Sequence, residues 1–189
     1  HATKVFNTCE GGAVVCHDPE TKRRLDLFRN FGFVDEVTVA SPGLNAKMNE
    51  LQAALGLLQL DYIDGAMAER AALADRYREF LGGLPGLRLL DDIPGVRHNN
   101  CYFPVLVDGR TFGASRDGLY EKLKRNGVHG RRYFYPLISR FPPYDALGSA
   151  RPGNLPAAEE AASRVLCLPI YPGLTEGEQD MIIELVGGL

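Results

Sequence analysis

The sequence predicts an α/β protein made of two parts. Short apolar runs rich in Val, Leu and Cys are typical of buried strands, and they alternate with segments whose apolar residues recur at helical spacing. These runs are residues 13–16, 101–107 and 165–168. A long helical pattern starts at Lys47 and is stopped by Gly82-Gly83. We expect it to connect a first part, residues 1–64, to a smaller second domain, residues 65–189.

Composition excludes several classes of protein. The chain has 189 residues, of which 45% are hydrophobic and 24% charged, and its formal net charge is −3. Its basic residues are too scattered for nucleic acid to be the main partner, because neutralising phosphates requires concentrated Lys and Arg. No apolar run approaches the ~20 residues of a membrane span, and the start lacks the layout of a signal peptide. We expect a cytoplasmic protein that binds neither nucleic acid nor membrane.

The cysteines and histidines show no spacing typical of a metal site. Cys9, Cys16, Cys101 and Cys167 form no Cys-x-x-Cys pair, which also argues against a disulfide framework. We expect reduced thiols, most of them in the core. No Ser-His-Asp arrangement or phosphate-binding loop stands out, so the sequence does not support a hydrolase or a nucleotide triphosphatase.

In the first part, the sequence predicts a strand and two helices. The apolar run Ala13–Cys16 follows a Gly-Gly turn and predicts a short buried strand. Asp18-Pro19 predicts a helix start, with Asp as the cap and Pro at the first helical position, and Gly32 predicts the end of this helix. The helix from Lys47 is apolar on more than one face, which requires burial on more than one side and suits a dimer. Gly65 predicts either a kink or a break between two helices.

The second part opens with strands and a helix. Strands are predicted at Leu87–Leu90 and Cys101–Val107, where Pro104 confines the strand to an edge or a bulge. Ser115 predicts the start of a helix that Asn126-Gly127 closes. A short strand is then predicted over Val128–Phe134.

The last third predicts a helix, a strand and a second helix. Pro156–Arg164 predicts a helix whose alanines pack inward, and Val165–Leu168 a buried strand. Thr175 to Glu178 is a capping box for the final helix. The residues expected to pack inward are Ala157, Ala158, Ala161 and Ala162 in the first helix, and Met181, Ile182, Leu185 and Val186 in the second.

The opening stretch His1-Ala-Thr-Lys4-Val-Phe-Asn-Thr-Cys-Glu-Gly-Gly12 resembles the lysine segment of the DegT/DnrJ/EryC1/StrS sugar aminotransferases. In that family the matching lysine holds pyridoxal 5'-phosphate (PLP) as a Schiff base. The resemblance therefore implies that Lys4 is the catalytic and cofactor-binding residue. A lysine amine attacks an aldehyde only when its ammonium is partly discharged, by desolvation or by neighbours. Without the resemblance, Lys4 is a solvated surface residue.

A second stretch, Gly43-Leu-Asn45-Ala-Lys-Met-Asn-Glu50 followed by Leu-Gln-Ala-Ala54, is similar to another pattern of the family. The family's asparagine reaches across a dimer interface to the partner's PLP phosphate, which implies this cofactor-binding role for Asn45. An Asn before a helix is also an ordinary N-cap. Relatives place the segment that matches Leu27–Gly32 near the active site, which makes Arg29 a substrate-binding candidate. Alternatively, Arg29 is a solvated cation at a helix end.

A third stretch, Arg131-Arg-Tyr133-Phe-Tyr-Pro-Leu137, departs from many relatives. They have His-Tyr in place of Tyr133-Phe134 and a histidine where Ile138 stands, so a histidine-based substrate contact does not carry over. This version is more similar to enzymes that aminate C4 of a TDP-linked 4-keto-6-deoxy sugar. Arg131 and Tyr133 are the substrate-binding candidates. Arg131 or Arg132 would hold a diphosphate or a donor carboxylate by a bidentate contact, and the alternative is surface ion pairs.

The resemblance implies that the chain is the C-terminal part of an aspartate-aminotransferase-like enzyme of fold type I. Residues 1–64 would end the large PLP domain and start the connecting helix, and residues 65–189 would form the small α+β domain. In relatives, a serine that binds the PLP phosphate and an aspartate that pairs with the pyridinium nitrogen precede the segment matching His1. We therefore expect the isolated chain to be inactive.

The implied function is transfer of an amino group from glutamate to a nucleotide-linked keto-deoxy sugar, such as TDP-4-keto-6-deoxyglucose. The enzyme would be a homodimer with active sites shared across the interface, acting in amino-sugar and lipopolysaccharide O-antigen biosynthesis. One alternative is a family member that acts on a C3-keto sugar or a keto-inositol, or that catalyses dehydration. Another is a non-catalytic dimerisation module or sensor domain of the same fold.

Overall fold

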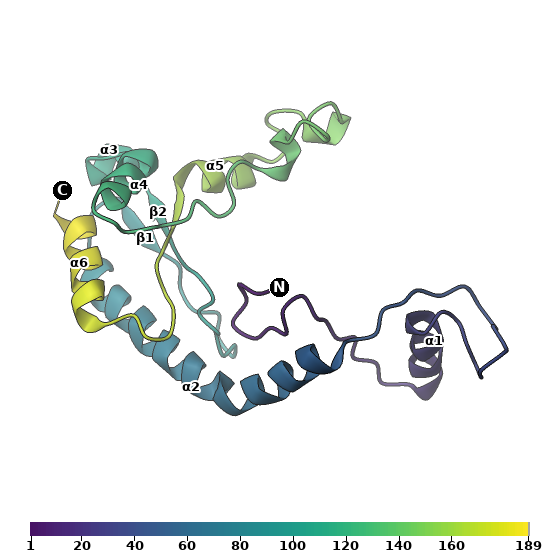
Figure 1. Cartoon of the computed structure of the whole chain (residues 1–189). Helices are drawn as coiled ribbons and strands as arrows, with labels where there is room; N and C mark the ends of the chain where they lie inside the picture. The colour runs from purple at the N-terminus through teal and green to yellow at the C-terminus, as the bar shows by residue number, and fades with distance from the viewer. Residues whose placement is uncertain (189) are drawn as a thin grey trace. The chain divides into compact units, whose positions relative to one another are not determined.

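The structure is a computed structural model that describes residues 1–188, and it divides into two compact units, His1–Asp64 and Gly65–Leu189 (Figure 1). In chain order the elements are α1 (Pro19–Arg29), α2 (Glu50–Leu81), β1 (Leu87–Leu89), β2 (Phe103–Val107), α3 (Gly109–Phe112), α4 (Arg116–Arg125), the 3-10 turns η1 (Ile138–Arg140) and η2 (Gly148–Ala150), α5 (Pro156–Arg164), β3 (Val165–Leu168) and α6 (Glu176–Gly187).

Helix α1 begins as the sequence predicts. The Asp18 carboxylate accepts a hydrogen bond of 2.7 Å from the Thr21 amide, and Pro19 occupies the first turn. The helix ends at Arg29, three residues before the expected stop at Gly32. The Gly32 amide still closes the end by donating to the Leu27 carbonyl at 2.7 Å.

The prediction of a strand at Ala13–Cys16 is wrong. Residues 1–64 contain isolated bridges and no strand, and Val14 and Val15 are exposed. A strand needs a neighbouring strand to satisfy its backbone amides and carbonyls, and unit His1–Asp64 offers none. The apolar pattern alone therefore did not produce a strand in this unit.

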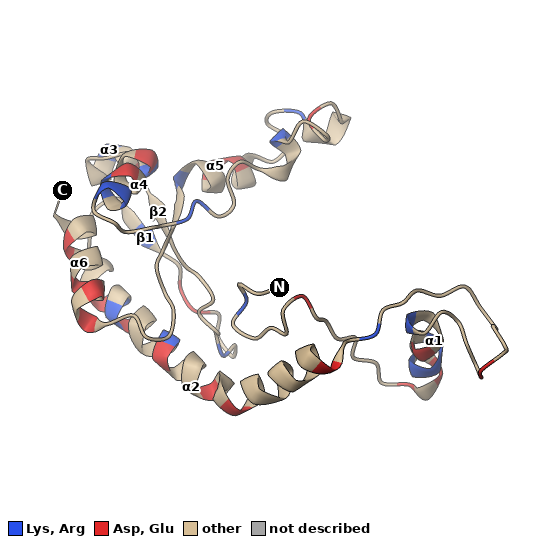
Figure 2. Ribbon diagram, viewed as in Figure 1, with Lys and Arg blue, Asp and Glu red and all other residues tan. Residues whose placement is uncertain are grey.

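Helix α2 is continuous through Gly65, so the predicted break between two helices does not occur. It begins at Glu50, and the Asn49 side chain caps it by accepting a 2.9 Å hydrogen bond from the Gln52 amide. Asn45 lies outside this cap, so its alternative interpretation as the N-cap is wrong. From Leu51 to Leu60 the helix has no charged residue, visible in Figure 2 as a tan stretch.

Unit Gly65–Leu189 contains an antiparallel sheet in the order β1-β2-β3. Pro104 was expected to confine its strand to an edge of the sheet or to a bulge. The edge position is wrong, because β2 is the central strand. The β1–β2 register ends at Val105, opposite Leu89. Pro104 pairs only with Cys167 of β3, so its missing amide hydrogen lies where β2 locally has one neighbour.

The strand predicted at Val128–Phe134 is reduced to one bridge between Arg131 and Cys167. The chain then turns, and the Tyr135 amide donates to the Arg132 carbonyl at 2.7 Å. A strand cannot continue through such a turn, because its amides no longer face β3. The other predicted helices and β3 form within a residue or two of their expected bounds.

The core of this unit lies between the sheet, the end of α2, α4 and α6. Its fully buried side chains include Tyr77, Leu81, Val105, Leu119, Leu123, Leu166 and Val186. The inward packing predicted for the four alanines of α5 holds only for Ala162, because a short helix buries one narrow face. In α6, Ile182 and Val186 are buried but Met181 is exposed.

Cys167 is the buried thiol, whereas the other three cysteines are partly or fully exposed, contrary to the expectation of core thiols.

Candidate active site

Lys4 lies in a turn whose backbone is held by hydrogen bonds. Its amide donates to the His1 carbonyl at 3.1 Å, and its own carbonyl accepts a 3.2 Å hydrogen bond from the Asn7 side chain. The same Asn7 side chain accepts from the Cys9 amide at 3.3 Å. Asn7 therefore ties both sides of the turn together and fixes the backbone from which the Lys4 amine extends.

The lysine turn docks on α2 through Thr8, which is 8% exposed. A Cβ added at Gly56 of α2 would lie 2.8 Å from the Thr8 methyl group, and one at Gly11 would lie 1.8 Å from the Thr8 hydroxyl oxygen. Gln52 of α2 also donates to the Cys9 carbonyl at 2.6 Å. Gly56 thus permits the close approach of Thr8 to α2, and Gly11 permits the turn that carries Lys4 to fold back on Thr8. The sequence analysis did not identify Thr8 or Gln52. The signal that could have pointed to them is Gly56, a glycine inside the helical pattern.

Arg29 and Asn45 are brought together in the same unit. The Ala46 amide donates to the Arg29 carbonyl at 3.0 Å, and Asn30 and Asn45 form an antiparallel bridge. The turn is tight because Gly32 has φ +82°, and a Cβ there would lie 1.7 Å from the Ser41 carbonyl oxygen. The backbone that carries Asn45 is therefore set by the end of α1.

The Arg29 guanidinium pairs with Asp26 one turn earlier, with Nε 3.1 Å from Oδ1. Both side chains are exposed, so this ion pair stabilises little and leaves the cation available to a ligand. Arg29 and Leu44 also line a groove of about 810 Å³ with the apolar residues 13–15.

Arg131 and Tyr133 lie together in unit Gly65–Leu189. The Arg131 guanidinium donates to the Tyr133 hydroxyl and lies over its ring, 5.3 Å from the centroid. The ring of Tyr102 meets Tyr133 edge to face at 5.3 Å. These contacts leave the Arg131 cation at the surface with a hydroxyl partner.

Arg132 has a different environment. Its Nη1 lies 2.8 Å from Oδ1 of Asp117, and its guanidinium lies 4.4 Å from the centroid of the Tyr120 ring. Burial opposes the charge of Asp117, but the hydrogen bond from Arg132 and the charge of Arg116 outweigh it, so the pKa of Asp117 is lowered. The hydrogen bond to Asp117 in turn raises the pKa of Arg132. Sequence reasoning allowed either arginine a ligand role and missed Asp117, whose position in the first turn of a helix gave no sign of it.

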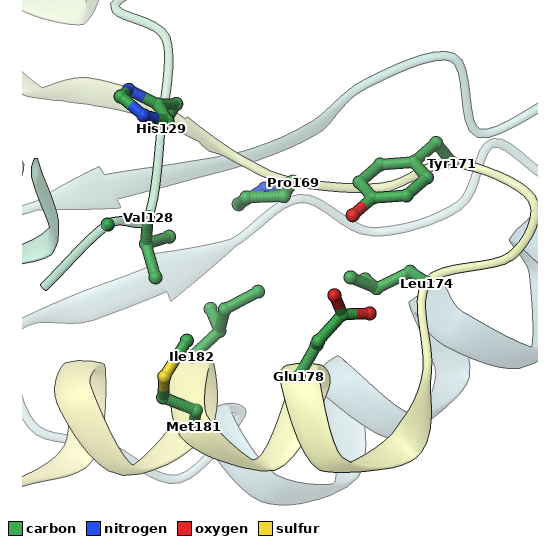
Figure 3. A pocket seen from close by; sticks show the side chains of 9 residues that line it. Val128, His129, Pro169, Tyr171, Leu174, Glu178, Met181 and Ile182 are labelled. Atoms are coloured by element: carbon green, nitrogen blue, oxygen red, sulfur yellow. The ribbon is translucent and has the colours of Figure 1, made fainter.

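A separate pocket of about 260 Å³ in this unit contains none of the predicted site residues (Figure 3). Val128, Leu174 and Ile182 form its apolar lining, and the Tyr171 hydroxyl and Glu178 carboxylate point into it. The Glu178 carboxylate already accepts from the amide and hydroxyl of Thr175 at 2.9 and 2.8 Å, which lowers its pKa. It serves as half of the capping box of α6.

Two absences hold for the described residues. Between His1 and Gly188 no group of three or more His, Cys, Asp or Glu side chains could hold a metal ion. In the same span no helix has the length and apolar character that crossing a membrane requires.

Sequence and structure comparisons identify relatives over almost the whole chain. It is 47% identical to a dTDP-4-amino-4,6-dideoxy-D-glucose transaminase of Escherichia coli, over 88% of this chain and 45% of that protein. It is 34% identical to a dTDP-3-amino-3,4,6-trideoxy-alpha-D-glucose transaminase of Streptomyces venezuelae, over 94% of this chain and 45% of that protein. The crystal structure of DesI in the presence of its TDP-sugar product aligns with a TM-score of 0.86 and 36% identity, over 98% of this chain and 47% of DesI.

The chain thus spans about half the length of the curated relatives that it matches. The solved structures that align with this chain belong to PLP-dependent aminotransferases of fold type I. This chain corresponds to their C-terminal part. A family model matches residues 1–187. On this match, with Lys4, Asn45 and the Arg131–Leu137 segment in the expected order, the chain belongs to the DegT/DnrJ/EryC1/StrS aminotransferase family.

Proposed function

We propose that the protein containing this chain is a cytoplasmic PLP-dependent enzyme that transfers an amino group from glutamate to a nucleotide-linked keto-deoxy sugar. The observation that carries the proposal is the fixed turn at Lys4, docked on α2 through Thr8, within a chain of this aminotransferase family. The donor groups suit the cofactor: Lys4 has an amine for the aldehyde, and Asn45 has an amide N–H for a phosphate oxygen.

Lys4 has two tasks in this proposal. PLP, when bound, supplies the electron sink for the negative charge that develops on the substrate carbon. The Lys4 Nζ holds the cofactor between turnovers, and it carries a proton to and from the reacting carbon when the substrate amine takes its place. The hydrogen-bonded turn fixes the backbone from which Nζ extends, and proton transfer requires that Nζ reach the reacting carbon.

Asn45 would bind the phosphate of PLP in a second copy of the chain. Its backbone is held by the end of α1, so its side chain is presented from a rigid turn. An amide N–H donates well to a phosphate oxygen but provides no charge. The enzyme would therefore be a homodimer, each active site combining Lys4 of one protomer with Asn45 of the other.

The substrate we propose is TDP-4-keto-6-deoxyglucose, aminated at C4. The name of the E. coli relative, a dTDP-4-amino-4,6-dideoxy-D-glucose transaminase, supports this sugar, and the Arg131–Leu137 segment is of the matching type. Arg131 and Tyr133 would contact the nucleotide-linked sugar. Arg29 is a further candidate for contact with an anionic group of a substrate. The product would be an amino sugar for lipopolysaccharide or O-antigen synthesis.

Replacing Lys4 tests the reaction. In the complete protein, Lys4→Arg keeps the positive charge but removes the primary amine, so we expect loss of the visible absorbance of bound PLP and a fall in turnover of at least about 1000-fold. Lys124→Arg is the matched control, because Lys124 is exposed on α4 and lies outside the motifs that carry the proposed site residues. Unchanged absorbance and turnover in Lys4→Arg would eliminate the assignment.

Amination at C3 is the second candidate, favoured by the 34% identity to the S. venezuelae 3-amino-sugar transaminase. The complete enzyme, incubated with glutamate and either 4-keto or 3-keto TDP-sugars, separates the two. Detection of the amino sugar by mass, with its position assigned by NMR, would show C4 amination if the first proposal holds.

A further inference from the structure

The adjacent arginines 131 and 132 have unlike surroundings. Arg132 is half-buried and paired with Asp117. Arg131 is exposed, and in the part of the chain that the structure describes its guanidinium pairs with the Tyr133 hydroxyl and with no carboxylate. A carboxylate partner already compensates the charge of an arginine and competes with an incoming phosphate, whereas an arginine paired with a neutral hydroxyl keeps its full charge for an incoming anion.

Asp117 links Arg132 to the body of the unit. Its Oδ1 accepts from Arg132 Nη1 and from Arg116 Nε, both at 2.8 Å. Arg116 is 4% exposed, and its Nη1 donates to the carbonyls of Ala162 and Val165 at 2.9 and 3.0 Å. These two carbonyls belong to the end of α5 and the start of β3. Asp117, Arg116 and Arg132, called here the Asp117 cluster, therefore connect segment 131–135 to the core.

The segment is held at both of its ends. At the first end, Arg131 exchanges backbone hydrogen bonds of 3.0 and 2.7 Å with Cys167 of β3. At the other end, the Tyr135 ring lies 4.6 Å from the Arg116 guanidinium and 5.5 Å from that of Arg132. The backbone between these attachments carries the Arg131 and Tyr133 side chains, so their position depends on both.

We propose that the Asp117 cluster is a positioning device that holds segment 131–135 so that Arg131 presents its guanidinium to the diphosphate of the nucleotide-linked substrate. This inference rests on the proposed function for its ligand. Two guanidinium groups and one carboxylate give the cluster a net charge of +1, and Arg131 adds another, so the segment attracts an anion. Without the Asp117 charge, the Arg116 and Arg132 cations would repel each other, and Arg132 would leave its place.

Substitutions in the complete PLP-loaded protein test this division of roles. Asp117→Asn keeps the size of the side chain but removes the charge, and Arg132→Met keeps most of the length but removes the fork. We expect each to weaken binding of thymidine diphosphate, measured by calorimetry, by about tenfold and to raise KM for the sugar nucleotide similarly, with kcat within about twofold. Arg131→Met should weaken thymidine diphosphate binding by at least as much. Arg110→Met, at a 95% exposed arginine, is the control and should leave both values unchanged.

A double variant shows whether Asp117 acts through Arg131. If it does, Asp117→Asn combined with Arg131→Met binds thymidine diphosphate no more weakly than Arg131→Met alone. Additive losses would overturn the proposal, because Asp117 would then act independently. A loss in Arg132→Met with none in Arg131→Met would also overturn it, since Arg132 would itself be the ligand.

Hydrogen exchange provides a readout that needs no ligand. Asp117→Asn should speed exchange at the amides of Arg131 and Cys167 by about tenfold or more, and unchanged exchange would overturn the positioning role. The two proposals fail differently. If the proposed nucleotide-linked substrate is wrong, the wild-type protein does not bind thymidine diphosphate. If only this inference is wrong, wild type and Asp117→Asn bind thymidine diphosphate equally well.

Discussion

At the scale of single residues, burial separates side chains of the same type. Arg116 is 4% exposed and gives its donors to two backbone carbonyls and one carboxylate, so its charge is compensated inside the unit. Arg110, six residues earlier, is 95% exposed and lies 3.9 Å from Asp108. The first arginine is part of the core and the second is a surface charge, although nothing in their sequence neighbourhoods distinguishes them.

Replacing Arg116 should destabilise the protein. Arg116→Met preserves apolar volume but leaves the Ala162 and Val165 carbonyls without this donor, and we expect the free energy of unfolding to fall by about 2–3 kcal/mol. Arg110→Met should change it by less than about 0.5 kcal/mol. Urea unfolding followed by circular dichroism measures both. Equal stability of the two variants would mean that the buried hydrogen bonds of Arg116 contribute no more than a surface ion pair.

At the scale of elements, local signals placed the helices well. Asp18, Ser115 and Thr175 each cap the helix that they were expected to start, because a cap is a hydrogen bond between residues two or three apart. Strands were less predictable. Residues 13–16 and 128–134 have apolar content suited to strands, but a strand forms only where a distant segment accepts its hydrogen bonds.

Two glycines of α2 should respond oppositely to alanine. A Cβ at Gly65 meets nothing within 4 Å, so Gly65→Ala gains helix propensity and should raise the free energy of unfolding by about 0.5–1 kcal/mol. A Cβ at Gly56 would lie 2.8 Å from the buried Thr8 methyl group, so Gly56→Ala should lower it by about 1–2 kcal/mol. Thermal unfolding of the complete protein measures both. Stabilisation by Gly56→Ala would show that Thr8 does not dock tightly on α2.

At the scale of the whole chain, the buried apolar residues are distributed unevenly. All of those found among residues 1–188 lie at Ala74 or later, in unit Gly65–Leu189. Unit His1–Asp64 buries Thr8, yet it exposes Val15 and Leu51 at 84% each. Apolar area removed from water is the main favourable term in folding. The second unit therefore has a core of its own, and the first has little.

Separate fragments should show this difference. We expect residues 65–189 to unfold cooperatively in urea, with an m value of about 1–2 kcal/mol/M, and residues 1–64 to show no cooperative transition. Circular dichroism over a urea series measures both. A cooperative transition in fragment 1–64 would contradict the conclusion that this unit has no core of its own.

The sequence by itself determined the α/β class, the starts of α1, α4, α5 and α6, and the family, because caps, periodicity and ordered motifs are local properties of the chain. Only the tertiary structure decided that β2 is central despite Pro104 and that residues 13–16 lack a partner strand. It also decided that Arg132 pairs with a carboxylate while Arg131 pairs with a hydroxyl at the surface. Each of these depends on contacts between residues distant in sequence. Pairing and burial are set by what the fold places alongside a residue, and no local pattern specifies that neighbour.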